Sequence, residues 1–258
     1  MDGIARTPSR SASLWLGLLI AILCVMYASY TRIQEFENWQ PASDPGDTLE
    51  VPVMSTLDAY YALRWAAAFQ SGTYEPHARD PLRLYDVRRH EIKVPAWLRW
   101  RHDPGWLPQL QPETLPLPSR LLAVGSRFCN NDIHCAGIYL PPLLSSLFII
   151  PLFLYFWRLG YPGMGILGGL VATFCHEYYR RSGAGWVDTD ALNLFFPWLI
   201  ASIFLLMHRG LPRAKLIFLS VAAGFGMYIF YLWYSRPGLA LVLLAVLFAH
   251  LLIQRVAM

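Results

Sequence analysis

Residues 14–30 read LWLGLLIAILCVMYASY, an apolar run close to the length of a membrane-spanning helix. Arg6 and Arg10 precede the run, and basic residues favour the cytoplasmic side of a span. The layout also resembles a signal peptide. Because no clean small-residue cleavage site follows and further apolar runs come later, we predict a retained signal anchor with a cytoplasmic N-terminus.

The composition also indicates a membrane protein. Of 258 residues, 55% are hydrophobic and only 15% are charged, which excludes an ordinary soluble domain. The net charge of +4 is small, and no nucleic-acid-binding pattern occurs, so we expect membrane lipid as a partner and no nucleic acid. The abundant Trp, Tyr and Phe are typical of interfacial anchors.

Five further apolar runs follow the first. They are 138–157, 164–175 with flanking residues, 192–207, 216–233 and 239–253. The predicted fold is therefore an all-α polytopic membrane protein with about six transmembrane helices. We expect three regions: the N-terminus and first helix at 1–30, a long outer loop at 31–137, and five helices at 138–258.

Threading these spans from a cytoplasmic N-terminus places most basic helix ends inside, as the positive-inside rule prefers. The inside residues are Arg158, His208, Arg209, Arg213, Lys215 and Arg255. Arg180 and Arg181 fall outside and break the rule. We predict an active face that is periplasmic or otherwise extracytoplasmic, in a cell inner membrane or the endoplasmic reticulum.

The long outer loop has recognisable parts. Residues 55–70 are rich in helix formers after a capping Ser or Thr, and Gly72 can end the helix, which predicts an amphipathic helix on the membrane surface. The Pro-, Trp- and Arg-rich stretch 76–118 predicts irregular structure. Cys129 and Cys135 could form a disulfide.

A metal site is the alternative for these cysteines, because Asp132 and His134 lie between them. In the third span, Gly165 and Gly169 have the small-xxx-small spacing of close helix packing. Gly163 and Gly168 would widen that face.

Three acidic residues fall at the outer membrane boundary: Asp58, Asp188 and Asp190. Carboxylates two positions apart can direct their oxygens at one hard divalent cation, which can then bind phosphate oxygens. Structural alternatives exist. Asp190 could cap the fourth span, and Arg181 could neutralise Asp188.

The stretch HEYYRRSGAGWVDTD at 176–190 resembles the second outer loop of the catalytic subunits of asparagine-linked oligosaccharyltransferases. TLDAY at 56–60 resembles the family's first acidic motif, and 142–151 resembles its second span. YLWYSRP at 231–237 is similar to its aromatic turn after the fifth span. The resemblance implies a partial GT-C-like glycosyltransferase fold.

The resemblance also implies an activity, namely transfer of a glycan from a lipid-linked oligosaccharide diphosphate to Asn in an Asn-x-Ser/Thr acceptor polypeptide, assisted by Mn2+ or Mg2+. It implies that Asp58 contacts both amide and metal, and that Asp188 and Asp190 serve the metal site. Arg181 matches an active-site Arg. Tyr234 and Arg236 are candidates for contact with the donor diphosphate.

Other family motifs are absent from the sequence. It contains no Trp-Trp-Asp, the family's acceptor-reading motif, and no acidic residue after Asp190 to match a further metal-binding Glu. We therefore expect the isolated chain to transfer glycan poorly or not at all. Three explanations fit the missing motifs: a separate chain that supplies them, a truncated reading frame, or a membrane module that has lost the activity.

Two other function classes also fit the sequence. One is another polytopic glycosyltransferase that uses lipid-phosphate sugars, and the other is a non-catalytic scaffold or transporter. A transporter would place ionisable residues at mid-membrane, which these runs largely lack.

Overall fold

The structure, a computed structural model, describes residues 10–39, 54–78, 112, 114–208 and 210–234, with isolated positions 242, 245 and 249. These parts are helical and contain no strand, which confirms the predicted all-α class. The elements are α1 (Arg10–Trp39), α2 (Leu57–Gln70), α3 (Leu117–Gly125), η4 (Ser126–Cys129), α4 (Ile133–Ser146), α5 (Ile149–Leu159), α6 (Pro162–Thr173), α7 (His176–Arg180), η5 (Thr189–Leu192), α8 (Phe195–Leu206) and α9 (Arg213–Trp233).

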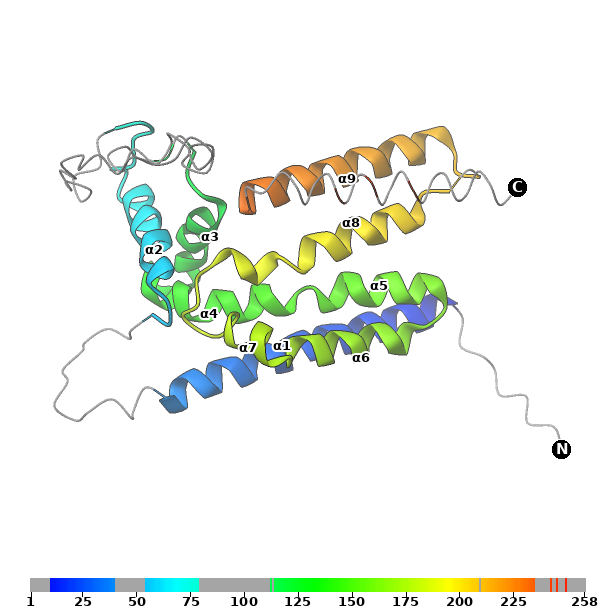
Figure 1. Cartoon of the computed structure of the whole chain (residues 1–258), viewed down its shortest axis with the longest axis horizontal. Coiled ribbons are helices and arrows are strands. Elements are labelled where there is room, and N and C mark those ends of the chain that lie inside the picture. Colours follow the sequence, from blue (N-terminus) through cyan, green and yellow to red (C-terminus); the bar gives the residue numbers. More distant parts are fainter. Residues whose placement is uncertain are drawn as a thin grey trace, which may run out of the picture.

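The long helices run side by side as a bundle, and the short ones gather at one end of it (Figure 1). At that end α2 and α3 stand across the bundle axis and pack on each other and on α4. The turns from α5 to α6 and from α8 to α9 lie at the opposite end. Arg158, His208, Arg213 and Lys215 belong to this opposite end, so these basic side chains are separated from the short helices.

Among the residues that the structure describes, four helical stretches are long and apolar enough to cross a membrane, as expected for a membrane protein. They are Ser13–Asn38, Ile133–Leu159, Thr189–Leu206 and Arg213–Trp233. The third predicted span differs, because α6 has only 12 residues. At 1.5 Å per residue it is about 18 Å long, less than the roughly 30 Å of hydrocarbon. Most of the predicted sixth span, 239–253, lies outside the described residues.

The second span is broken between α4 and α5, and serine hydroxyls bind a carbonyl in the last turns before the break. Pro141 and Pro142 lie inside α4, which ends at Ser146 before α5 continues the span. The carbonyl of Pro142 accepts hydrogen bonds from Ser29 (3.1 Å) and Ser146 (3.0 Å). Because Ser29 belongs to α1, the break in the span also becomes a contact between helices.

The small-residue spacing of α6 allows the close helix packing that it predicted. The partner helix is α5. A Cβ atom at Gly165 would lie 2.8 Å from the Cα of Phe153, and one at Gly169 would lie 3.2 Å from Ile149. Gly163 and Gly168 do not widen this face, contrary to the prediction. A Cβ at either position would meet nothing within 4 Å, because both face open space.

The segment predicted as the long outer loop contains more helix than expected. Helix α1 continues to Trp39, and α3 begins at the end of the stretch 76–118 that was expected to be irregular, most of which lies outside the described residues. The predicted helix at 55–70 is confirmed as α2, and Gly72 follows it with a φ of 73°. Its buried alanines and Leu63 pack in one core with residues of α3 and α4, so protein covers this face.

A disulfide joins Cys129 and Cys135, whose Cα atoms are 6.0 Å apart. Of the two alternatives for this pair, the structure therefore contains the bridge. Asp132 has another role, since its carboxylate accepts a hydrogen bond from the His134 N–H (2.8 Å) at the start of α4. The carboxylate is an N-cap.

Candidate functional site

The Asp-Thr-Asp motif lies in the connection between α7 and α8, at the end of the bundle where α2 and α3 stand. Asp188 caps the short helix η5: its Oδ1 accepts hydrogen bonds from the N–H (2.5 Å) and hydroxyl (3.2 Å) of Thr189. Both bonds reach Oδ1, and no group among the described residues binds Oδ2. The capping carboxylate is thus Asp188. Asp190 does not cap α8, the structural alternative considered for it, because no side chain caps that helix.

Asp190 has different partners from Asp188. Its Oδ1 accepts a hydrogen bond from the side-chain amide of Asn193 (3.0 Å), and its Oδ2 lies 3.6 Å from Nη1 of Arg181. Arg181 therefore does pair with an aspartate, but its partner is Asp190 and not Asp188 as the alternative had it. Arg180 has a carboxylate as well, since its Nη2 lies 3.4 Å from Glu177. Each arginine that breaks the positive-inside rule thus has an acidic partner.

The start of α2 is fastened to the same connection. The Ser55 N–H donates to the Gly185 carbonyl (3.2 Å), and the Ser55 hydroxyl donates to the Ala184 carbonyl (2.7 Å). Gly185 has a φ of 73°, a conformation that favours glycine. The backbone of Asp58, in the first turn of α2, is thereby held beside the loop that carries Asp188. The Asp58 side chain lies outside what the structure describes.

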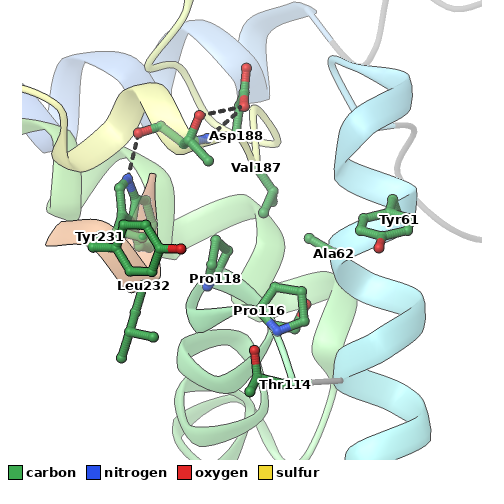
Figure 2. A pocket seen from close by; sticks show the side chains of 12 residues that line it. Tyr61, Ala62, Thr114, Pro116, Pro118, Val187, Asp188, Tyr231 and Leu232 are labelled. Carbon is green, nitrogen blue, oxygen red and sulfur yellow. Dashed lines mark hydrogen bonds between the residues drawn. The ribbon is translucent and has the colours of Figure 1, made fainter. Parts of the chain in front are cut away.

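A cavity of about 410 Å³ opens where α2, the segment before α3, the Asp188 loop and the end of α9 meet (Figure 2). Tyr61 and Tyr231 come from different helices and lie on different sides of it. The full lining is Tyr61, Ala62, Thr114, Pro116, Pro118, Ser119, Val187, Asp188, Thr189, Tyr231, Leu232 and Trp233. Mixed apolar walls with a few polar groups are typical of ligand sites.

A second cavity, of about 440 Å³, lies on another side of the same loop. Its lining is Glu177, Tyr178, Arg181, Asp190, Asn193 and Leu194. The two aspartates of the motif therefore line different cavities. Their spacing of two positions suggested a shared ligand, but η5 begins between them and turns their side chains to different surroundings.

The aromatic turn after α9 contributes to the first cavity through residues other than those predicted. The Trp233 indole donates to the Thr189 carbonyl (2.5 Å), which ties the end of α9 to the aspartate loop. Tyr231 lines the cavity, whereas the Tyr234 ring stacks on Phe230 with centroids 6.5 Å apart. Arg236 lies outside the described residues.

The sequence contained a signal for these missed residues. Tyr231 and Trp233 belong to the quoted motif at 231–237, and Tyr61 follows Asp58 by three positions, which is one helical turn.

Tyr178 fixes α7 at the boundary between the second cavity and the bundle. Its hydroxyl donates to the Ser145 carbonyl of α4 (2.8 Å). Burial raises the pKa of this hydroxyl well above its ordinary value, so it stays protonated and keeps donating at physiological pH.

The described residues form only part of a metal site. Among them, no group of three or more His, Cys, Asp or Glu side chains could hold a metal ion. The donor chemistry nevertheless suits a hard cation, because Asp188 offers a carboxylate oxygen that no described group binds. Asp58 is the residue whose position would let it add a second carboxylate.

Comparison with known proteins gives two findings. Residues 114–257 match the family described as "Oligosaccharyl transferase STT3, N-terminal". The chain is also similar to proteins named undecaprenyl-diphosphooligosaccharide--protein glycotransferase from two strains of Campylobacter jejuni, at 30% identity over 97 residues. The matched part is 38% of this chain and 13% of each relative.

Proposed function

Because the chain belongs to the STT3 family of oligosaccharyl transferases, matched through the family's N-terminal part, we propose that it takes part in moving a glycan from a lipid-linked diphosphate to an asparagine side chain. The acceptor we propose is Asn in an Asn-x-Ser/Thr sequence. The observation that carries the proposal is one cavity that brings together Asp188, Thr189, Tyr61 and Tyr231 at one end of the bundle. The name of the similar Campylobacter proteins supports the donor class.

The chemistry demands carboxylates. An amide nitrogen is a poor nucleophile because its lone pair is delocalised, and a carboxylate that accepts hydrogen bonds from the amide can orient it for attack. We assign this role to Asp58, which the start of α2 holds beside the cavity. The Asp188 oxygen that no described group binds would, with Asp58, hold Mn2+ or Mg2+, and such a cation stabilises negative charge on a departing diphosphate.

The hydroxyls of Tyr61 and Tyr231 can donate hydrogen bonds to a donor in this cavity. Both side chains are about half exposed, so a ligand can reach them. Leu232 and Trp233 add apolar wall for the lipid-proximal part of such a donor. In this proposal Tyr231 takes the place of Tyr234, whose ring is engaged with Phe230.

Arg181 and Asp190 support this site from the neighbouring cavity. Their ion pair spans the connection from the end of α7 to η5, so it sets the path of the loop that presents Asp188. We propose this supporting role for both residues, which the family resemblance placed directly in the active site.

We place the reaction on the extracytoplasmic face of a cell inner membrane or the endoplasmic reticulum. The disulfide supports this, because disulfides persist in oxidising compartments and this one lies at the same end of the bundle as the cavity. The basic residues of the α5–α6 and α8–α9 turns lie at the other end, as a cytoplasmic end requires.

Cysteine labelling tests this placement. In native protein isolated without reductant, we expect Cys129 and Cys135 to resist alkylation and to react only after reduction, while exposed Cys175 reacts at once. Mass spectrometry of the labelled peptides measures both. Equal labelling of all three before reduction would contradict the oxidised pair and its compartment.

Metal titration tests the proposed role of Asp188. We expect Asp188→Asn to weaken Mn2+ binding by roughly tenfold or more, because a charged oxygen ligand is lost. Asp190→Asn, the matched control from the same loop, should weaken binding by less than about threefold, since Asp190 contacts Arg181 and Asn193 at another cavity. Isothermal titration of the two variants measures the difference.

Two outcomes would change the proposal. Equal losses of Mn2+ affinity in both variants would mean that Asp190 also binds the metal. Unchanged binding in both would favour a scaffold without catalytic metal.

The test of the function itself is glycan transfer by the purified full chain, from a lipid-linked diphosphate oligosaccharide to a fluorescent Asn-x-Thr peptide, with the Gln-x-Thr peptide as control. Donor binding is measured in parallel with Mn2+ and with EDTA. Absence of both transfer and Mn2+-dependent donor binding would reject the proposal.

A further inference from the structure

Arg32 is a buried cation at the outer end of α1 that none of the proposed chemistry uses. Its side chain is only 1% exposed. It forms no ion pair with the residues that the structure describes, and its described hydrogen-bond partners are all neutral groups. Because burial of a charge is costly, the surrounding hydrogen bonds must be numerous and well placed for the guanidinium to stay there.

All five N–H groups of the guanidinium have acceptors. Nε and Nη2 both donate to the Ser182 hydroxyl oxygen (3.2 and 3.1 Å). Nη1 donates to the Ala28 carbonyl (3.0 Å) and the Ser146 hydroxyl (3.3 Å), and Nη2 also donates to the Thr173 carbonyl (2.9 Å). The guanidinium carbon Cζ lies over the Tyr179 ring, 4.8 Å from the ring centroid.

These partners come from four places in the chain: α1, α4, the end of α6 and the loop after α7. Ser182 matters most for the site, because it follows Arg181 directly and begins the loop that leads to Asp188. The Ser182 hydroxyl donates in turn to the Tyr178 carbonyl (2.5 Å), so the same oxygen joins Arg32 to the end of α7.

The loop 182–190 is held at three places along its length. At its beginning Arg32 binds the Ser182 hydroxyl, and the Ser145 hydroxyl donates to the Ser182 carbonyl (3.3 Å). Ser55 holds Ala184 and Gly185 in the middle, and Trp233 holds Thr189 near its end. Of these four residues, Arg32 is the one that carries a charge. An arginine fits this position because its planar fork fixes the directions of several acceptors at once.

We propose that Arg32 is a positioning residue for the transfer site. It acts through Ser182 to set the path of the loop that carries Asp188 and Thr189 along the first cavity, where we propose that the donor binds. The expected effect of Arg32 on donor binding rests on the proposed function. The structural part of the proposal, the hold on the loop, stands independently of that function.

The test compares two serines that bind the same guanidinium. Ser182→Ala removes the acceptor on the loop, and Ser146→Ala removes an acceptor on α4. We expect Ser182→Ala to speed amide hydrogen exchange at 183–190 by tenfold or more and to weaken Mn2+-dependent binding of a lipid-linked diphosphate oligosaccharide by about tenfold. Ser146→Ala should change neither, whatever it does to the melting temperature.

Arg32 variants complete the experiment. Arg32→Lys has three donors on a flexible stem and should reproduce the loop exchange of Ser182→Ala, and Arg32→Met should do the same. Once Arg32 is methionine, adding Ser182→Ala should have little further effect on loop exchange, because the two residues act as one unit.

Two results would overturn the proposal: loop exchange in Ser182→Ala that equals the wild-type value, or equal effects of the two serine substitutions on the loop and on donor binding. The second would make Arg32 a general stabiliser of the bundle. If the wild-type chain binds no donor, the proposed function fails, while hydrogen exchange still decides whether Arg32 holds the loop.

Discussion

Asp188→Asn is expected to lower the rate of glycan transfer by on the order of 10³-fold, about 4 kcal/mol in activation free energy. Asparagine keeps the shape and one acceptor oxygen, so the cap on Thr189 can survive. What is lost is the negative charge on the oxygen that no described residue binds. Single-turnover transfer with excess protein measures the effect, because it quantifies slow reactions.

The matched control is Asp132→Asn. Asp132 is also an N-cap, with its carboxylate on the His134 N–H, and it does not line the cavity of Asp188. We expect less than a threefold change in the transfer rate for this variant. A similar loss in both variants would mean that Asp188 acts only as a cap. Where transfer is too slow to compare, Mn2+-dependent donor affinity should fall about 100-fold for Asp188→Asn alone.

Gly165→Ala is expected to destabilise the bundle by about 2 kcal/mol. The added Cβ would lie 2.8 Å from the Cα of Phe153 and 2.9 Å from the carbonyl oxygen of Leu152, both backbone atoms of α5. Since backbone cannot rotate away as a side chain can, α5 and α6 must separate. Overpacking of this kind costs about 1–3 kcal/mol. Thermal unfolding in detergent, followed by tryptophan fluorescence, measures the change.

Gly168→Ala provides the control on the same helix. A Cβ there would meet nothing within 4 Å, and alanine is the better helix former by up to about 1 kcal/mol. We therefore expect unchanged or slightly raised stability. Equal destabilisation by both substitutions would show that the loss comes from the glycine backbone itself and not from contact with α5.

Membrane character and helical class could be read from the sequence, because both depend on local composition. A run such as 14–30 has few alternatives to a spanning helix, since lipid offers its backbone no hydrogen-bond partners. The helix at 55–70 was predictable for a similar reason, with helix formers between a capping residue and Gly72. Helix α3 was missed because its short apolar stretch follows a Pro-rich segment, and its stability comes from packing on α2.

The candidate site was predictable in its residue types but not in its arrangement. The motif at 176–190 led to Asp188, Asp190 and Arg181, and all three lie at one end of the bundle. Their spacing suggested convergence on one ligand, yet the pairing of Arg181 with Asp190 and the start of η5 place the two carboxylates at different cavities.

By itself, then, the sequence determined that this protein crosses a membrane as helices and carries its acidic motif next to the start of an apolar run. These properties follow from hydrophobicity and charge along the chain. Only the tertiary structure decided which side chains meet: Arg32 with Ser182, Trp233 with Thr189, and Tyr61 with Tyr231 across one cavity. The reason is that these pairs are far apart in sequence, and the packing of helices sets their geometry.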